Sequence, residues 1–217
     1  MNSFRLFGII GIVAAMLGIT ADLLLLYVPN GGYEKWDYQF FTQISPERIY
    51  WGHLIGVLCI PFELAGFWQV YKSLEPAGRK WVIPVLLPIV VVTIWGVAYH
   101  AMLAGLAAYM RLQANAALPL ELSLSTFQHL KATIEPLGYL LFFLFVYISV
   151  GLFYLIRFKN TYYPRWTAWV NPLLIYIAAV GLYLLFPQHI GSMAIVAGFN
   201  LSIFIVLSTS TIVLWKR

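Results

Sequence analysis

Four histidines and three carboxylates stand out in this chain because they lie within or beside long apolar segments. An ionisable side chain near hydrocarbon costs several kcal/mol unless it is paired, metal-bound or hydrated, so such residues indicate a function. Threading the apolar segments through a membrane in alternating directions brings most of these side chains toward the same side. Those side chains are Asp22, His53, His100, His129, Glu135 and His189.

Zinc chemistry is the first function that these residue types favour. Two or three neutral imidazoles and a carboxylate suit a catalytic zinc site, which keeps one position open for water. We expect Asp22, His53 and His100 as ligands, with His189 or His129 as a further candidate. Zinc lowers the pKa of bound water to about 7, and Glu135 is the expected general base. The protein would then be a membrane-embedded hydrolase acting on an ester or amide of a lipid or other amphiphile near its headgroup.

A metal-free enzyme uses the same residues. His53 and Asp22 would form an acid–base couple for isomerisation or acyl transfer, or would simply be a buried pair that joins two helices. Thr20 and Thr133 are the nearest hydroxyl nucleophiles, but no known motif surrounds them. The chain contains neither the HExxH motif of zinc proteases nor the GxSxG motif of serine hydrolases.

The second class of function is a small transporter or a solute- or ion-binding membrane protein. Glu63 lies near the middle of its apolar segment and would extend the polar cluster inward. We expect it to be protonated or to join an inner hydrogen-bond network with Asn171 or a tyrosine. A b-type haem held by His53 and His100 is a further alternative, which the neighbouring carboxylates disfavour.

Three of these residues also have purely structural interpretations. His129 and His189 lie in loops or at their margins, where histidines are commonly solvated. Lys131 can pair with Glu135 across one helical turn, which would make that carboxylate structural. The single cysteine, Cys59, has no partner for an intrachain disulfide and is expected to be a buried, inert thiol.

The composition determines the class of protein that must position these groups. The chain has 217 residues, of which 62% are hydrophobic and 10% are charged, and a mean hydropathy of +0.84. Soluble domains carry about 25% charged residues, so this chain is a membrane protein in contact with the lipid bilayer. The net charge of +5 does not indicate nucleic-acid binding, because the basic residues mark the ends of apolar segments. The oligomeric state is left open.

We predict a single-domain, all-α bundle of six transmembrane helices. About 20 residues rising about 1.5 Å each cross a hydrocarbon core of about 30 Å. The third predicted span is longer than this and is expected to tilt or project. The spans are 5–28, 47–72, 81–110, 133–158, 164–186 and 191–214.

Local signals mark the starts of two of these helices. Ser45 is a suitable N-cap for the second span, and Pro46 suits its first helical position. Residues 125–128 match a capping box, which predicts a short helix that carries His129 and leads into the fourth span. Pro136 is expected to kink or restart that span.

Lysine and arginine placement predicts the orientation. Positive residues concentrate on the cytoplasmic side, which places both termini in the cytoplasm, with a bacterial plasma membrane as the expected location. The more basic ends hold Arg5, Lys72, Arg79, Lys80, Arg157, Lys159, Arg165, Lys216 and Arg217, and the opposite ends hold Lys35, Arg48, Arg111 and Lys131. An outer interfacial belt is predicted from Tyr27, Tyr33, Trp36, Tyr38 and Tyr50.

Small residues share a helical face with three of the polar side chains. Because small residues mark close helix contacts in membranes, we expect Asp22, His53 and His100 to point into an outward-opening pocket among the first four helices. Tyr139 in the fourth helix and Asn200 in the sixth would complete its wall. The small residues are Gly11, Ala15 and Gly18 near Asp22, Gly52 and Gly56 near His53, and Gly96, Ala104 and Ala107 near His100.

Two segments near the start of the chain carry a resemblance to known proteins. The first span ends in Asp22-Leu23-Leu24-Leu25-Leu26-Tyr27-Val28-Pro29, and Tyr50-Trp51-Gly52-His53 opens the second. This pattern resembles an uncharacterised family of bacterial six-pass membrane proteins, which implies an architecture but no activity. The polar cluster is also similar in idea to the CREST membrane hydrolases, which place histidines and an aspartate around zinc. Their HxxxH in the last span is absent here, so none of their residues is carried over.

Overall fold

The computed structural model describes residues 3–33, 38–115 and 120–215, and within these ranges the chain forms helices and no strands. The predicted belt residue Trp36 and the charges Lys35, Lys216 and Arg217 lie outside the described residues. The α-helices are α1 (Ser3–Leu26), α2 (Pro46–Cys59), α3 (Glu63–Leu74), α4 (Arg79–Asn115), α5 (Leu120–Phe158), α6 (Pro172–Leu185), α7 (Ile190–Val196) and α8 (Gly198–Val213). Short 3₁₀ helices are η2 (Gln39–Gln43), η3 (Ile60–Phe62), η4 (Glu75–Ala77) and η5 (Arg165–Trp169).

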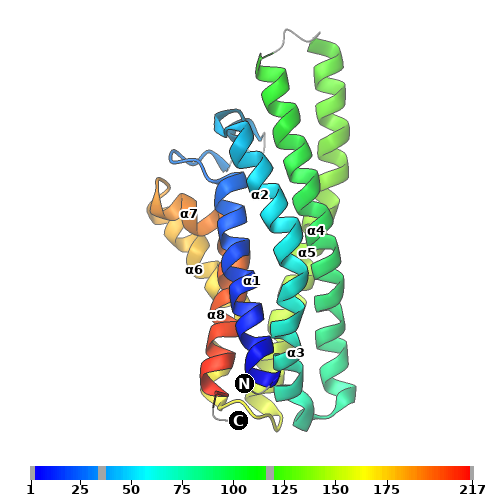
Figure 1. The fold of residues 1–217 in the computed structure, drawn as a ribbon, viewed down its shortest axis with the longest axis vertical. Helices are drawn as coiled ribbons and strands as arrows, with labels where there is room; N and C mark the ends of the chain where they lie inside the picture. The colour runs from blue at the N-terminus through cyan, green and yellow to red at the C-terminus, as the bar shows by residue number, and fades with distance from the viewer. Residues whose placement is uncertain (1–2, 34–37, 116–119, 216–217) are drawn as a thin grey trace.

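The helices run alternately up and down one long axis (Figure 1). The start of α1 and the end of α8 lie at one end of the molecule, which we call the N/C side. The opposite end, called the loop side, holds the segment after α1 and the α6–α7 turn, which are joined by a hydrogen bond from the His189 N–H to the Pro29 carbonyl (3.0 Å). Helix α1 packs against α2, α3 and α8 and is the centre of one half of the bundle.

Four helical segments are long and apolar enough to cross a membrane, and the bent α7–α8 pair makes five if it is counted as one span. The segments are α1, Pro46–Ala77, α4 and Ser125–Phe158. The predicted fifth span, 164–186, contains only the 14 residues of α6 as regular helix, about 21 Å long. The chain is therefore a membrane-embedded helical protein, and the predicted count of six spans is not confirmed.

The short α6 has a local cause. Residues 165–169 form η5 against α5, and Asn171 then caps α6, with its side chain accepting from the Leu173 N–H (3.1 Å). The Asn171 Nδ2 also donates to the carbonyl of Ser149 (2.8 Å), nine residues before the end of α5. Helix α6 thus starts inside the bundle, about 13 Å from the end of α5.

Helices α4 and α5 contain 37 and 39 residues and rise beyond every other element on the loop side (Figure 1). The expected projection of the third span is thus present. The predicted capping box at 125–128 is wrong as a helix start, because α5 already begins at Leu120. The helix also continues through Pro136 rather than restarting there. A local capping signal is overridden where the flanking residues on both sides continue the helix.

The second predicted span is broken near its middle. Ser45 caps α2 as predicted, accepting from the Arg48 N–H (3.3 Å), with Pro46 at the first helical position. The 3₁₀ turn η3, which contains Pro61, then separates α2 from α3. A proline lacks an N–H and clashes with the preceding turn, so it interrupts the regular helical hydrogen bonding. This break sets Glu63 at the first position of α3.

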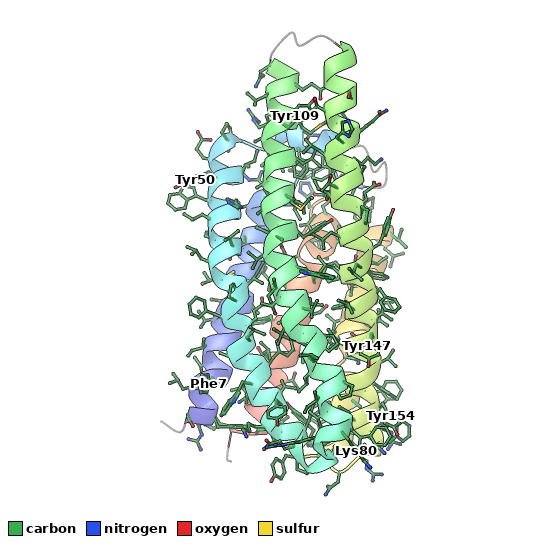
Figure 2. All side chains as sticks on the ribbon, turned by 90° about the vertical axis from the view of Figure 1, so that its right-hand side faces the viewer. Phe7, Tyr50, Lys80, Tyr109, Tyr147 and Tyr154 are labelled. Atoms are coloured by element: carbon green, nitrogen blue, oxygen red, sulfur yellow. The ribbon has the colours of Figure 1, made fainter. Side chains whose placement is uncertain are left out.

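The aromatic residues of the predicted belt have divided roles. Tyr50 is exposed and projects away from the ribbon in Figure 2, as an interfacial residue would. The Tyr33 hydroxyl instead caps the end of α1: it accepts from the Val28 N–H (2.8 Å) and donates to the Leu26 carbonyl (3.1 Å). Tyr38 is buried against Phe41. Both belong to the packed cover of the loop side, so their place in the belt was wrongly predicted.

Candidate functional site

Asp22 is buried in the interior of the helix bundle. It lies one turn from the end of α1 and is 7% exposed. Gly11, Ala15 and Gly18 on the same face are buried too, as their spacing predicted. This face of α1 meets α8, so the carboxylate of Asp22 points toward helices distant in the sequence.

Asn200 on α8 is the hydrogen-bond partner of Asp22. Its Nδ2 donates to Asp22 Oδ2 at 2.8 Å, and both side chains are buried. Gly18 provides the room, since a Cβ atom there would lie 2.8 Å from the Asn200 Cγ. Asn200 is the third residue of α8, which follows a 77° bend after α7. The start of α8 therefore lies next to the Asp22 carboxylate.

His100 on α4 is the second ionisable group of this cluster. It is 5% exposed, and its Nδ1 lies 3.9 Å from Asp22 Oδ1. Its Nε2 lies 3.0 Å from the carbonyl oxygen of Gly52 on α2. Gly56, one turn further along α2, leaves the space that the imidazole ring occupies. Four helices, α1, α2, α4 and α8, thus enclose the Asp22–Asn200–His100 cluster.

The hydrogen-bond pattern fixes the tautomer of His100 beside Asp22. A backbone carbonyl only accepts, so His100 Nε2 must carry a hydrogen to bond Gly52. In a neutral imidazole the Nδ1 atom is then an acceptor, and it faces a carboxylate oxygen. The 3.9 Å between them is too long for a direct hydrogen bond, yet two acceptors that face each other in a buried site repel, and a proton bound at either one relieves this repulsion. The proton would lie on Asp22 or make His100 an imidazolium, so the pair favours binding one proton.

His53 does not share this arrangement. It follows Gly52 in α2 but is only half-buried, and its Nδ1 is a buried atom without a hydrogen-bond partner. Asp22 is bonded to Asn200 and approaches His100 instead of forming the predicted pair with His53. The two glycines beside His53 face the neighbouring helices, while the histidine lies one position off that face.

The predicted residues on α5 and in the α6–α7 turn lie elsewhere. Glu135 forms an ion pair with Lys131 (3.5 Å), which is its structural alternative, and is partly exposed. Tyr139 is 67% exposed, so it does not line the buried cluster. His129 and His189 are exposed, and His189 has a positive φ of 47° in its turn. Of the two residues expected to complete the wall of the pocket, Asn200 on α8 lies beside Asp22 and Tyr139 does not.

The four predicted zinc ligands are not assembled into one centre. Among the residues that the structure describes, no group of three or more histidine, cysteine, aspartate or glutamate side chains is arranged to hold a metal ion. Asp22 and His100 approach each other, whereas His53 makes no hydrogen bond through its buried Nδ1 and His189 lies in an exposed turn.

Comparison with known proteins adds a family and no activity. A family model matches residues 1–217. The chain belongs to DUF6796, a family of unknown function. No curated protein and no solved structure matches it. The resemblance to an uncharacterised family agrees with this result.

Glu63 is the second buried carboxyl of this DUF6796 chain. It is 3% exposed at the start of α3, and its Oε1 has no hydrogen-bond partner. The predicted bond to Asn171 is not formed, because the Asn171 side chain bonds Ser149 and caps α6.

A second polar cluster, which the sequence analysis missed, surrounds Gln69 on the N/C side. Gln69 is 1% exposed; its Oε1 accepts from Thr211 (3.0 Å) and Ser210 (3.3 Å) on α8, and its Nε2 donates to the Phe4 carbonyl (3.3 Å). Ser210 also bonds the Tyr163 hydroxyl (2.6 Å). The spacing carried no clear signal, because six residues turn a helix by about 600° and leave Gln69 about 120° around α3 from Glu63.

Two hollow regions of this DUF6796 member lie outside the Asp22 cluster. A cavity of about 20 Å³ adjoins Tyr163 and Ser210, a volume that fits one water molecule. An apolar groove of about 470 Å³ runs between α1 and the α2–η3 segment. The groove is lined by Ile9, Ile10, Val13, Ala14, Leu17, Ile55, Leu58, Cys59 and Phe62.

Proposed function

We propose that this protein is a small proton-binding membrane transporter whose proton site is the Asp22–His100 pair. The observation that carries the proposal is the pair's geometry. Asp22 Oδ1 faces His100 Nδ1 at 3.9 Å while the Gly52 carbonyl holds the other ring nitrogen in its protonated form. A site that favours one bound proton can take it from one side of a membrane and give it to the other, provided that access alternates.

The surroundings support a transport role for this pair. Ionisable groups inside membrane bundles are expensive and commonly belong to proton relays or substrate pathways. The bent α7–α8 segment supports the proposal as well, because interrupted helices line the sites of many secondary transporters. The hydrogen bond from Asn200 holds the carboxylate in place whichever residue carries the proton.

Proton flux into reconstituted liposomes tests this function. Vesicles containing the purified protein and a trapped pH dye receive a potassium diffusion potential through valinomycin. We expect a flux that falls at least tenfold in Asp22→Asn and in His100→Gln and stays unchanged in Glu135→Gln, the matched carboxyl control outside the cluster. Flux in the wild type equal to that of protein-free vesicles, or unchanged flux in Asp22→Asn, would overturn the proposal.

We further propose six passes with both termini in the cytoplasm of a bacterial cell. The alternating helix directions support this topology if η5 with α6 and the bent α7–α8 pair each count as one pass. The charge asymmetry supports it as well, since arginines and lysines are more numerous on the N/C side. In a Cys59→Ser background, a membrane-impermeant maleimide added to intact cells should label Asn30→Cys but not Asn160→Cys, and the reverse result would invert the topology.

Chemistry on a lipid or amphiphile is a second candidate function, favoured by the apolar groove between α1 and α2. An acyl chain fits such a groove, whose floor includes Cys59 and Ile55 of the helix that also holds His53. Metal analysis of the pure protein separates the two candidates. Stoichiometric zinc that is lost in both His53→Ala and Asp22→Ala would favour a zinc-dependent hydrolase, and a Soret band would favour haem instead.

A further inference from the structure

Three buried residues of α3 form an ordered series along the bundle. Glu63, Gly66 and Gln69 are spaced by three residues, so each lies about 4.5 Å further along the axis than the one before. Gly66 and Gln69 contact both α1 and α8. The series runs from the level below the Asp22 cluster to the Gln69 cluster on the N/C side.

Glu63, the first member of the series, has an unsatisfied buried carboxyl oxygen. Its Oε1 is buried and makes no hydrogen bond. The titratable groups that interact with it are Cys59 on α2 and Asp22 on α1, neither of them a cation, and α8 contains no titratable residue between Gly198 and Val213. A buried carboxyl with no cation beside it is stable when it holds a proton or bonds a water molecule.

Gly66, the second member, is covered by a single leucine. A Cβ atom on Gly66 would lie 2.6 Å from Leu207 Cδ1, and a Cβ atom on Gly11 would lie 3.1 Å from the same methyl group. Leu207 is fully buried. The α1 and α3 backbones also touch here, because a Cβ atom on Gly11 would lie 2.5 Å from the Gly66 Cα. This contact leaves no space for water between the helices.

Gln69, the third member, belongs to a hydroxyl-rich cluster that continues toward the N/C side. Its bonds to Thr211 and Ser210 lead to the Tyr163 hydroxyl and to the adjoining cavity of about 20 Å³. Polar groups therefore lie on both sides of Leu207, along one seam of α1, α3 and α8.

We infer that Glu63 is an internal proton acceptor on this seam and that Leu207 is the hydrophobic barrier that separates it from the Gln69 cluster. The inference rests on the proposed proton-transport function and adds its path. Glu63 holds a proton at rest; when Leu207 moves and water enters, its O–H bond breaks and the proton passes to that water toward Gln69. The Glu63 carboxylate then forms a new O–H bond with a proton released by cleavage of an N–H or O–H bond at the Asp22–His100 pair. Constrictions made of apolar side chains gate by excluding water, which is the role assigned to Leu207.

Hydrogen–deuterium exchange of the Glu63 carboxyl tests the barrier without any transport assay. The carboxyl C=O infrared band of the protonated side chain shifts in D₂O, and its loss in Glu63→Gln identifies it. In nanodiscs prepared with the wild type, we expect slow exchange that becomes at least tenfold faster in Leu207→Ala and moderately faster in Leu207→Val. Leu25→Ala, a matched leucine truncation in the loop-side core, should leave the rate unchanged. A rate unaltered by Leu207→Ala, or raised equally by Leu25→Ala, would overturn the barrier.

Flux in the same variants tests the path. Leu207→Ala should raise proton flux at least tenfold, and the added Glu63→Gln substitution should remove that increase. If the double variant retains the increase, Glu63 is not on the path. If exchange responds to Leu207 while Asp22→Asn leaves the wild-type flux unchanged, the barrier stands and the Asp22–His100 function fails, so the two failures are distinguishable.

Discussion

Gly56 of α2 lies directly against the imidazole ring of His100 on α4, so the absence of a side chain at position 56 is what admits the histidine to the bundle. The same helix supplies the Gly52 carbonyl that the ring bonds. One face of α2 therefore determines both the position and the tautomer of His100.

Gly56→Ala should displace His100 and destabilise the protein. An added methyl group meets ring atoms, and such overpacking costs about 1–3 kcal/mol in free energy of unfolding. Unfolding by a denaturing detergent measures this change. Gly96→Ala is the control, because a Cβ atom at Gly96 meets nothing within 4 Å; equal destabilisation by both substitutions would contradict the contact.

Asn200→Ala should destabilise the protein through its effect on Asp22. The substitution leaves Asp22 Oδ2 buried without its donor, which costs about 1–3 kcal/mol or more for a charged group. The same unfolding assay measures the loss. Ser202→Ala is the matched buried control, because the Ser202 hydroxyl bonds only the Gly198 carbonyl within its own helix (2.6 Å), and it should have a much smaller effect.

Arg48→Met should loosen the end of α1. The guanidinium donates to the carbonyls of Leu23 (2.8 Å) and Tyr27 (2.7 Å) at the end of α1, where the backbone acceptors lack a full set of helical partners. Hydrogen bonds to charged groups contribute about 1.5–3 kcal/mol each, so we expect amide exchange in the last turn of α1 to become at least tenfold faster. Mass spectrometry of peptides covering 20–28 measures it, and exposed Glu47→Gln should leave the rate unchanged.

Tyr33 should make stability fall at high pH. Burial raises the pKa of Tyr33 from 10.0 to about 12, against the opposing effect of the Val28 N–H bond. Between these values an unfolded chain releases the phenolic proton while the folded protein retains it, so the group's stabilisation is complete below pH 10 and is lost as the pH rises toward about 12. Thermal melts across this range should lose that part of their pH dependence in Tyr33→Phe, and an identical profile in both proteins would contradict the cap.

Helix faces could be read from the sequence where small residues mark them. Gly11, Ala15 and Gly18 share the buried face of Asp22, because close contact between membrane helices requires small side chains. The same argument failed for His53, since Gly52 and Gly56 each face a neighbour and the histidine falls between faces.

The bonds across the bundle were beyond local patterns. Asn200 was expected at the wall of the pocket, but its hydrogen bond to Asp22, 178 positions away, depends on the bend between α7 and α8 at Ala197, and no periodicity predicts that bend. Glu135 was predicted at the site from its depth in the membrane alone. Its helix packs beside α4, and the Glu135 carboxylate forms an ion pair with Lys131 instead. Depth along a membrane can be estimated from sequence, but the rotation of a long, evenly apolar helix cannot.

The overhang of α4 and α5 gives this 24.6-kDa protein an experimental handle. Two adjacent helices that leave the apolar slab together offer rigid attachment points for a fused helical scaffold or an antibody fragment. Such a bound scaffold or fragment would make particles large enough for electron cryomicroscopy. An antibody fragment that binds this hairpin on intact cells would also show on which side of the membrane the hairpin extends.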